Sequence, residues 1–200
     1  EDVTEREEAN ARIAHMALHD ELTQLANRTL FLSSLESLRD RMDAGSSVAL
    51  MLCDLDDFKP VNDRSGHAAG DAVLRECARR MVDAVPQAHV VARLGGDEFA
   101  LAFPMEAGVD PLRVADRLIE AIGRPYVFQD QSLTIGACIG VVVFVDRDIS
   151  IDSMIRRADL ALYAAKSDGA NRSRLFEPVM EQEATTRREL AADLAEAIAA

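Results

Sequence analysis

The chain has 200 residues, of which 48% are hydrophobic and 28% are charged, and its formal net charge is −13. This length allows one domain with a substantial core and excludes two full-sized domains. The acidic balance excludes a protein that binds nucleic-acid polymers or anionic membranes by general charge attraction, so a phosphate ligand needs metal ions or local lysines.

The cysteines and the chain ends indicate the compartment. Cys53, Cys77 and Cys138 are widely spaced in apolar or helical segments, which predicts buried free thiols and a reducing, cytoplasmic location. No apolar run approaches the length of a membrane span, and residues 1–10 lack the basic and apolar regions of a signal peptide. The chain begins and ends on helical patterns, so we expect a piece of a longer protein, and a membrane anchor elsewhere in that parent is compatible with it.

The first predicted elements lead from a connector to the middle of a sheet. Charges at most positions of residues 1–19 predict an exposed or paired helix. Apolar residues at helical spacing predict a second helix over 29–42, and the apolar run 48–53 predicts a strand covered on both faces. This strand ends at Asp54 and Asp56, which places carboxylates at a rim of the sheet.

The rest of the chain alternates strands and helices around one hairpin. After the strand we predict a polar, glycine-containing loop up to Asp71 and then a helix to about Val85. Residues 89–103 predict a hairpin whose two-residue turn is Gly95-Gly96. The later predicted elements are a helix over 111–122, a short strand, a turn and a long strand over 126–144, a helix over 151–166 and a strand over 173–176. We therefore predict an α/β fold with a mixed central sheet rather than a purely parallel one.

Asp54 and Asp97 are the first candidates for a functional site. If residues 48–53 form the central strand and the hairpin pairs beside it, these two carboxylates can approach each other. Mg²⁺ prefers oxygen ligands from one or two carboxylates and substrate phosphates, and two such ions can activate an attacking oxygen and stabilise a leaving one. On these residues alone a second interpretation stays open, because Gly-Gly-Asp is also an ordinary hairpin turn with solvated acids.

The segment "CDLDDFKPVNDRSGHAAGDAVL" adds groups that suit a nucleotide ligand. Lys59 is a candidate phosphate partner, and Asn62 and Asp71 supply hydrogen-bonding groups for a purine. Gly66 and Gly70 stand where the backbone comes close to a ligand or a neighbouring segment.

This segment, followed by "RLGGDEF", resembles the GGDEF family of diguanylate cyclases, which join two GTP molecules into cyclic di-GMP and release pyrophosphate. The signature Gly95 to Phe99 is intact. "HDELTQLANRTLF" is similar to the family's opening "D-x-LTGLPNR", and "RADLALYAAKSDGANR" is similar to its closing "AD-x-ALY-x-AK-x-x-GRNR". The resemblance covers Asp20 to about Phe176 and implies a palm-like nucleotidyl cyclase fold.

The resemblance also implies roles for individual residues. The Mg²⁺ or Mn²⁺ ligands would be Asp54, the backbone of Leu55, and Asp97. Glu98 would be a further acidic group, either the base or the metal partner for the attacking 3′-hydroxyl. Phe58 and the loop at Asp57 would lie along the triphosphate through backbone N–H groups. Asn62 and Asp71 would be the guanine-reading residues, and Lys59 and Lys166 would contact phosphates.

Two of the candidates have simpler structural interpretations. His67 is a substrate-binding candidate within a glycine loop, and we expect it to organise that loop rather than act as a catalytic base. Lys166 lies near the end of a predicted helix, where a cation also complements the helix dipole. The resemblance favours a phosphate contact for Lys166.

The chain departs from the family at several positions. Many members have an inhibitory "R-x-x-D" motif before the signature, and here Pro86 and His89 occupy its two charged positions. We therefore expect no product feedback through that site. Ala170 replaces the first arginine of "GRNR", which removes one expected phosphate contact, and Asp57 adds negative charge near the phosphates.

We divide the chain into a connector over 1–19, a GGDEF domain over 20–176 and a linker over 177–200. The linker's helical pattern looks like the segment that precedes an EAL phosphodiesterase domain in composite proteins, although other alanine-rich tail helices share this pattern. The leading hypothesis is an active diguanylate cyclase in which a transient homodimer presents two GTP molecules. The alternatives are a catalytically weak GTP-binding module that controls an EAL domain in cis, and another two-metal nucleotidyl transferase.

Overall fold

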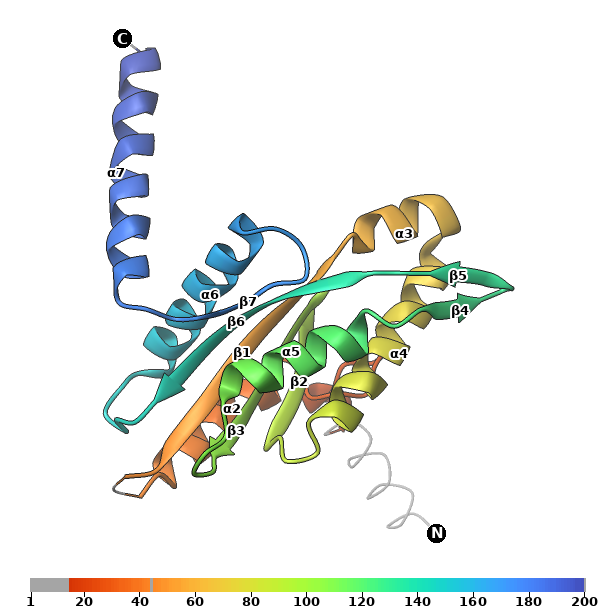
Figure 1. Cartoon of the computed structure of the whole chain (residues 1–200), viewed down its shortest axis with the longest axis horizontal. Helices are drawn as coiled ribbons and strands as arrows, with labels where there is room; N and C mark the ends of the chain where they lie inside the picture. Colours follow the sequence, from red (N-terminus) through yellow and green to blue (C-terminus); the bar gives the residue numbers. More distant parts are fainter. Residues whose placement is uncertain (1–14, 44, 200) are drawn as a thin grey trace, which may run out of the picture.

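The computed structural model describes residues 15–43 and 45–199 (Figure 1). Residues 1–14, which make up most of the predicted connector, lie outside the described residues, and residues 15–18 are helical. The described part consists of a five-stranded sheet, a separate two-stranded ribbon and helices on both faces of the larger sheet.

The central strand of the larger sheet is β1 (Ser47–Asp56), and the strand order is β2-β3-β1-β6-β7. β2 (Val90–Gly95) and β3 (Glu98–Met105) form the predicted hairpin on one side of β1. β6 (Gly136–Phe144) and β7 (Ser173–Leu175) lie on the other side. Only the β6–β7 pair of this sheet is parallel among the described strands, so the predicted mixed sheet is confirmed.

Helices cover both faces of this sheet. α4 (His67–Ala84) and α5 (Pro111–Ile122) pack on one face, and α2 (Arg28–Asp40) and α6 (Ile151–Ser167) pack on the other. The predicted boundaries of α5 are those observed, and α5 begins where Asp110 accepts a hydrogen bond from the N–H of Leu112.

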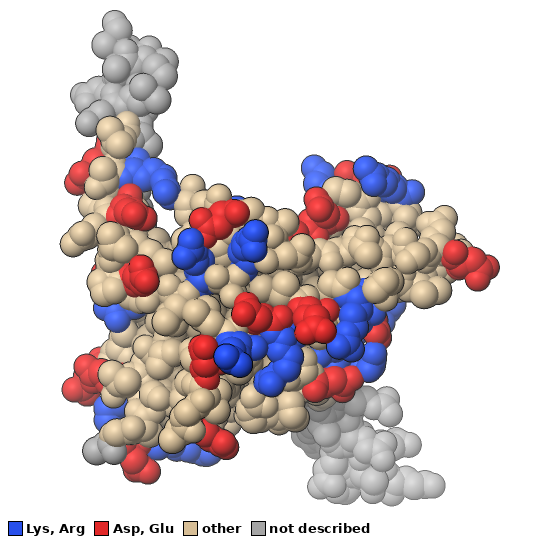
Figure 2. Space-filling model, in the orientation of Figure 1, with Lys and Arg blue, Asp and Glu red and all other residues tan. Residues whose placement is uncertain are grey.

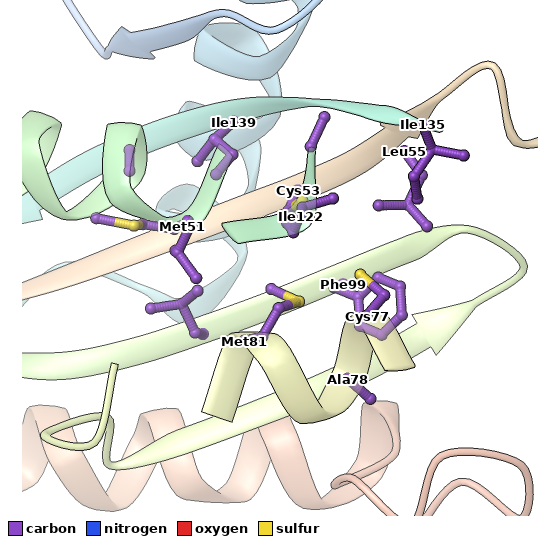
Figure 3. Close-up of a cluster of buried hydrophobic side chains, with 14 of the residues drawn as sticks. Met51, Cys53, Leu55, Cys77, Ala78, Met81, Phe99, Ile122, Ile135 and Ile139 are labelled. Carbon is purple, nitrogen blue, oxygen red and sulfur yellow. The ribbon is translucent and has the colours of Figure 1, made fainter. Parts of the chain in front are cut away.

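Each face of the sheet has its own hydrophobic core because successive strand residues point to opposite sides. Met51, Cys53 and Leu55 of β1 join the core under α4 and α5, which Figure 3 shows. Leu50 and Leu52 join the core under α2 and α6. The apolar run of β1 is therefore buried on both faces, as its sequence predicts.

The cysteines are buried and free, as predicted. Cys53 and Cys77 lie in the core shown in Figure 3, and burial raises the pKa of the Cys77 thiol to about 12. A thiol with such a pKa is almost entirely protonated at neutral pH and is a poor nucleophile. Cys53 and Cys77 therefore serve as core residues.

The segment after β1 differs from the prediction, because the expected loop contains a helix, α3 (Phe58–Ser65). Asp57 takes a left-handed conformation with φ of 62° and turns the chain from the strand directly into this helix. Phe58 and Val61 bury one side of α3. The helix is easy to miss in the sequence, because it is short, lacks a side-chain N-cap and has a proline in its first turn.

After α5 the predicted short strand and turn are observed, whereas the predicted long strand that follows them is divided into two strands. β4 (Tyr126–Phe128) and β5 (Gln131–Leu133) form a separate ribbon, and β6 begins only at Gly136. The turn of the ribbon consists of Gln129 and Asp130, which both have positive φ. Three-residue strands have too few side chains to show a period in the sequence.

A long C-terminal helix, α7 (Val179–Ala199), extends away from the sheet (Figure 1). Its first turn is held to α6 by Glu181, whose Oε1 lies 3.0 Å from Nη2 of Arg156 and 3.4 Å from Nε of Arg157. In the described part of the chain, no helix combines the length and the apolar character that crossing a membrane requires.

Candidate active site

The carboxylates of Asp54 and Glu98 lie on the same face of the sheet, near the end of β1 and at the start of β3. Asp54 lies directly opposite Glu98 in the antiparallel register, and residues in that relation project from the same face. Cys138, opposite Asp54 on β6, belongs to the core under α2 and α6, so this is the face that α6 covers. The register therefore brings together two residues that the sequence singled out separately.

Asp97 lies in the turn between β2 and β3. The turn consists of Gly96 and Asp97, one residue later than the predicted Gly95-Gly96, because Gly95 still pairs with β3 across a bulge. Gly96 has φ of 53°, a left-handed conformation that glycine adopts without strain. The carbonyl of Asp97 accepts a hydrogen bond from the N–H of Leu55 at 3.3 Å, which ties the turn to the end of β1.

Lys166 forms an ion pair with Asp54 at this rim. Its Nζ lies 2.8 Å from Oδ1 of Asp54, whose side chain is 18% exposed. Burial raises the pKa of Asp54 and the charge of Asp97 adds to the rise, while Lys166 lowers it. Burial lowers the pKa of Lys166, but the bond to Asp54 outweighs this effect and the net shift is upward. One lysine and the carboxylates of Asp54 and Asp97 therefore share one half-buried rim.

The candidate guanine-reading residues lie on the other side of the end of β1. Asn62 on α3 packs against α4 at Gly70, where an added Cβ would be only 2.1 Å from the Asn62 Oδ1 and 3.2 Å from the Cζ of Phe58. Glycine is required at position 70 because any side chain would displace Asn62. Asp71 is the next residue of α4 after Gly70.

Lys59 and His67 have more exposed positions. Lys59 lies in the first turn of α3 and is exposed. His67 does not organise a loop, contrary to the expectation, because it is the first residue of α4 after Gly66, whose φ of 81° separates the two helices. The contacts of these side chains with a substrate remain predictions.

A residue that sequence reasoning missed, Arg93, joins the opening motif to the signature turn. Its Nη1 lies 3.1 Å from both carboxylate oxygens of Asp20, and its Nε and Nη2 donate to the carbonyl of Gly96 at 3.0 and 2.8 Å. Burial raises the pKa of Asp20, but hydrogen bonds from Thr23 and Arg93 outweigh this and lower it. Both residue types were visible in the sequence, because Arg93 precedes the signature and Asp20 opens the first motif, but their pairing was not.

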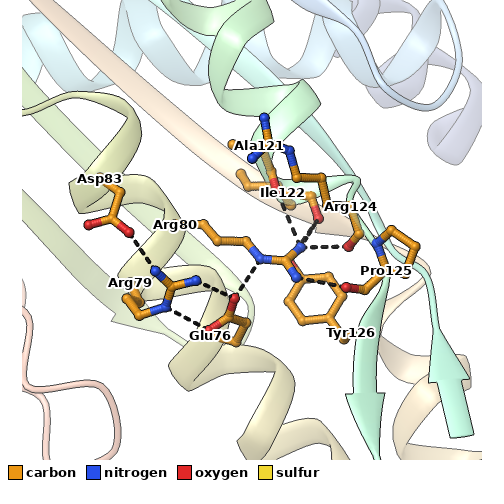
Figure 4. Close-up of polar contacts among 9 residues, drawn as sticks. All are labelled: Glu76, Arg79, Arg80, Asp83, Ala121, Ile122, Arg124, Pro125 and Tyr126. Carbon is orange, nitrogen blue, oxygen red and sulfur yellow. Dashed lines mark hydrogen bonds and ion pairs between the residues drawn. The ribbon is translucent and has the colours of Figure 1, made fainter.

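The flank formed by α4 and α5 holds Arg79 and Arg80, which precede the lost inhibitory motif in the sequence (Figure 4). Arg80 donates to the carbonyls of Arg124 and Pro125 and to Glu76, and its guanidinium lies 3.8 Å from the centre of the Tyr126 ring. Hydrogen bonds from Arg79 lower the pKa of Glu76 to about 2. These two arginines are therefore used within the fold.

A groove of about 520 Å³ lies on this flank and is lined by Pro86 and by residues of both signs, among them Arg117, Glu120 and Arg124. Figure 2 shows positive and negative side chains interleaved on this side of the molecule rather than gathered by sign. A mixed surface of this kind gives little attraction for a strongly anionic ligand.

A second groove opens beside Glu98 on the face between α2 and α6. Its volume is about 390 Å³, and it is lined by Leu52, Leu94 and Arg28 as well as Glu98. Glu98 therefore faces open space next to the metal-binding candidates, where a reacting group has room to enter.

Comparison with known proteins identifies relatives over most of the chain. A family model described as "Diguanylate cyclase, GGDEF domain" matches residues 17–172. Diguanylate cyclase TpbB of Pseudomonas aeruginosa PAO1 is 39% identical over 86% of this chain, and the match spans 40% of TpbB. The bifunctional diguanylate cyclase/cyclic di-GMP phosphodiesterase MucR of the same strain is 35% identical over 95% of this chain and 28% of MucR.

Solved structures agree with this comparison. A fragment of TpbB that comprises only its GGDEF domain superposes with a TM-score of 0.77 at 36% identity, covering 84% of this chain and 99% of the fragment. The chain thus spans less than half the length of the curated relatives described here, and its fold is that of one of their domains.

Proposed function

Because the chain belongs to the diguanylate cyclase GGDEF domain family, we propose that it condenses two GTP molecules into cyclic di-GMP with release of pyrophosphate. The observation that carries the proposal is the rim at the end of β1. There Asp54 lies opposite Glu98, the Asp97 turn is tied to Leu55, and Lys166 reaches Asp54 at 2.8 Å.

The residues at the rim fit Mg²⁺ or Mn²⁺. Among the described residues, no three His, Cys, Asp or Glu side chains form a ready-made metal cage. Asp54, Asp97 and the Leu55 carbonyl instead offer the partial oxygen set that Mg²⁺ completes with substrate phosphates and water. When bound, the ion neutralises phosphate charge and activates the attacking hydroxyl.

The other site residues bind and orient GTP in this proposal. Asn62 and Asp71 hydrogen-bond the guanine edge, and Phe58, which is 8% exposed, approaches Gly70 beside Asn62. The triphosphate lies toward the first turn of α3, whose free N–H groups favour anions, and Lys59 in that turn adds a positive charge. We keep His67, at the first position of α4, as an outer contact of the substrate.

Lys166 and Glu98 take roles in charge and proton handling. Lys166 exchanges its partner Asp54 for a phosphate when GTP and the ion enter, so the charge of Lys166 keeps a partner in both states. Glu98, exposed beside the groove, accepts the proton of the attacking 3′-hydroxyl.

Each domain holds one GTP, so two copies must meet for the condensation. A transient homodimer presents the two triphosphates to each other, and the rate at low protein concentration is second order in the chain. This expectation separates the reaction from hydrolysis or transfer within one subunit.

The test is to incubate the chain with GTP and Mg²⁺ over a range of protein concentrations and to quantify cyclic di-GMP and pyrophosphate. We expect a specific activity that rises with protein concentration, and no comparable turnover of ATP. Absence of cyclic di-GMP at high protein concentration would overturn the proposal. Equal turnover of ATP would favour a different two-metal nucleotidyl transferase.

A second candidate function is a regulatory GTP-binding module that controls an EAL domain in cis. Ala170 favours this candidate, because the chain lacks one expected phosphate contact there. The relative MucR is named for both the cyclase and the phosphodiesterase activity. In this version residues 177–200, helical over α7, form the linker to that EAL domain. Tight GTP binding by calorimetry without detectable turnover decides for the module.

A further inference from the structure

The turn that follows α6, residues 168–172, lies against the end of β1 through a carboxylate that has no role in the proposed chemistry. Oδ2 of Asp56, the last residue of β1, accepts a hydrogen bond from the backbone N–H of Asn171 at 2.8 Å. The Cys138 thiol lies 3.3 Å from the same oxygen and 3.3 Å from the carbonyl of Gly169, so it sits between the strand and the turn.

The side chain of Asn171 also contacts the start of β6. Its Oδ1 accepts a hydrogen bond from the N–H of Ala137 at 3.2 Å, and its backbone has φ of 56°, a left-handed conformation that asparagine tolerates better than most residues. A Cβ on Gly136 would lie 2.6 Å from that Oδ1. Asn171, although exposed, thus bridges the ends of β1 and β6, and a glycine at 136 makes room for its side chain.

This clasp, formed by Asp56, Asn171 and the start of β6, is next to the active-site lysine. Lys166 lies in the last turn of α6, and the N–H of Gly169 bonds back to its carbonyl at 3.3 Å. Asp54, the partner of Lys166, is two residues before Asp56 on the same face of β1. One face of one strand end therefore holds both the lysine and the turn that follows it.

We propose that Asp56 is a positioning residue for GTP turnover: through Asn171 it fixes residues 168–172 and so holds Lys166 over the phosphate side of the rim. The inference rests on the proposed function, in which Lys166 contacts a phosphate. A carboxylate that accepts a backbone N–H forms a charge-assisted hydrogen bond, which is stronger than the neutral bond an amide would make. Side chains on flexible ends bind less tightly than those held in place, because ordering them costs entropy.

The test is a double-mutant cycle with Asp56→Asn and Lys166→Met, measured as KM and kcat for GTP. Asp56→Asn keeps the size of the side chain and weakens the clasp, and we expect KM to rise about tenfold while kcat changes by less than about threefold. In the Lys166→Met background the same change should alter KM by less than about twofold, because the residue being positioned is gone.

The control is Asp148→Asn, the same chemical change at an exposed position after β6, at the end of the sheet away from the rim. We expect it to leave KM, kcat and the melting temperature unchanged. If Asp56→Asn raises KM equally in both backgrounds, or lowers kcat and stability together without affecting KM, then the clasp is only structural and the inference is wrong.

Two further readouts separate this inference from the proposed function. If the chain without substitutions binds GTP but does not turn it over, the same double-mutant cycle is measured as the Kd for GTP by calorimetry, with the same expected changes. Amide hydrogen exchange at Asn171 in the GTP-free protein should speed up at least about tenfold in Asp56→Asn. Unchanged exchange would contradict the clasp whatever the chain catalyses.

Discussion

The rim at the end of β1 and the flank of α4 and α5 are both rich in charge, but they use it differently. On the flank, Arg80 has protein partners for nearly all of its donors and is 12% exposed. At the rim, Lys166 is 43% exposed and its single carboxylate partner is itself a candidate metal ligand. A charged side chain whose hydrogen-bond donors all have partners within the protein stabilises the fold. A charged side chain that is partly exposed and has a single partner is available to bind a ligand.

Removing an acid from the rim gives the largest effect on activity that this comparison predicts. We expect Asp97→Asn to lower kcat/KM at least about 100-fold, because a charged ligand of the ion is lost. Stability should be unchanged or slightly higher, since the charge of Asp97 opposes that of Asp54. Turnover assays and thermal melts measure both, with Asp148→Asn as the matched control. Near-normal activity in Asp97→Asn would show that Asp97 is not a ligand of the ion.

Removing Arg80 from the flank should lower the stability of the protein and leave its activity nearly unchanged. We expect Arg80→Ala to cost about 2 kcal/mol in the free energy of unfolding, because the carbonyls of Ala121, Arg124 and Pro125 lose this donor and the Tyr126 ring is uncovered. The kcat/KM for GTP should stay within about twofold. Arg79→Ala is the control, because Arg79 is 62% exposed and solvent weakens its ion pairs. Equal losses in urea unfolding for both variants would refute this account of the flank.

Adding charge at the rim should sharpen the contrast. Ala170 is exposed in the turn after α6. We expect Ala170→Arg to lower the KM for GTP about fivefold by supplying a phosphate contact, with kcat little changed. Ala170→Gln extends the side chain without the charge and should leave KM near that of the parent. A lower KM in both variants would show that charge is not the cause.

The smallest expected effect is the response to product. With Pro86 and His89 at the inhibitory positions and with Arg79 and Arg80 bonded internally, added cyclic di-GMP should leave kcat unchanged. Competition at the active site raises only the apparent KM. Initial rates at several GTP concentrations, with and without micromolar product, measure both terms. A fall in kcat at saturating GTP would reveal a second product site.

Much of the fold could be predicted because its signals are local. The apolar run of β1, the paired runs around Gly95-Gly96 and the caps of α5 each depend on residues close together in the chain. The helix α3 was missed because its start depends on one left-handed residue, Asp57, and not on a capping side chain.

The composition of the site was more predictable than its connections. Motifs named Asp54, Asp97 and Lys166, but only the β1–β3 register shows that Asp54 faces Glu98. The contacts of Arg93 with Asp20 and of Asp56 with Asn171 join segments far apart in sequence, which no local pattern encodes. Each of these residues appears in a quoted motif, so the residue type was visible and its partner was not.

The central place of β1 also has a kinetic consequence. Asp54 gains its neighbours only when β1 has paired with β3 on one side and with β6 on the other, and β6 lies late in the chain. Non-local antiparallel pairing is slow to form, commonly on a scale of about milliseconds to seconds. We expect the rim to be among the last parts to assemble during refolding, so that recovery of GTP binding lags behind recovery of helical signal. A chain released from the ribosome before β6 emerges has the acids in its sequence but no site.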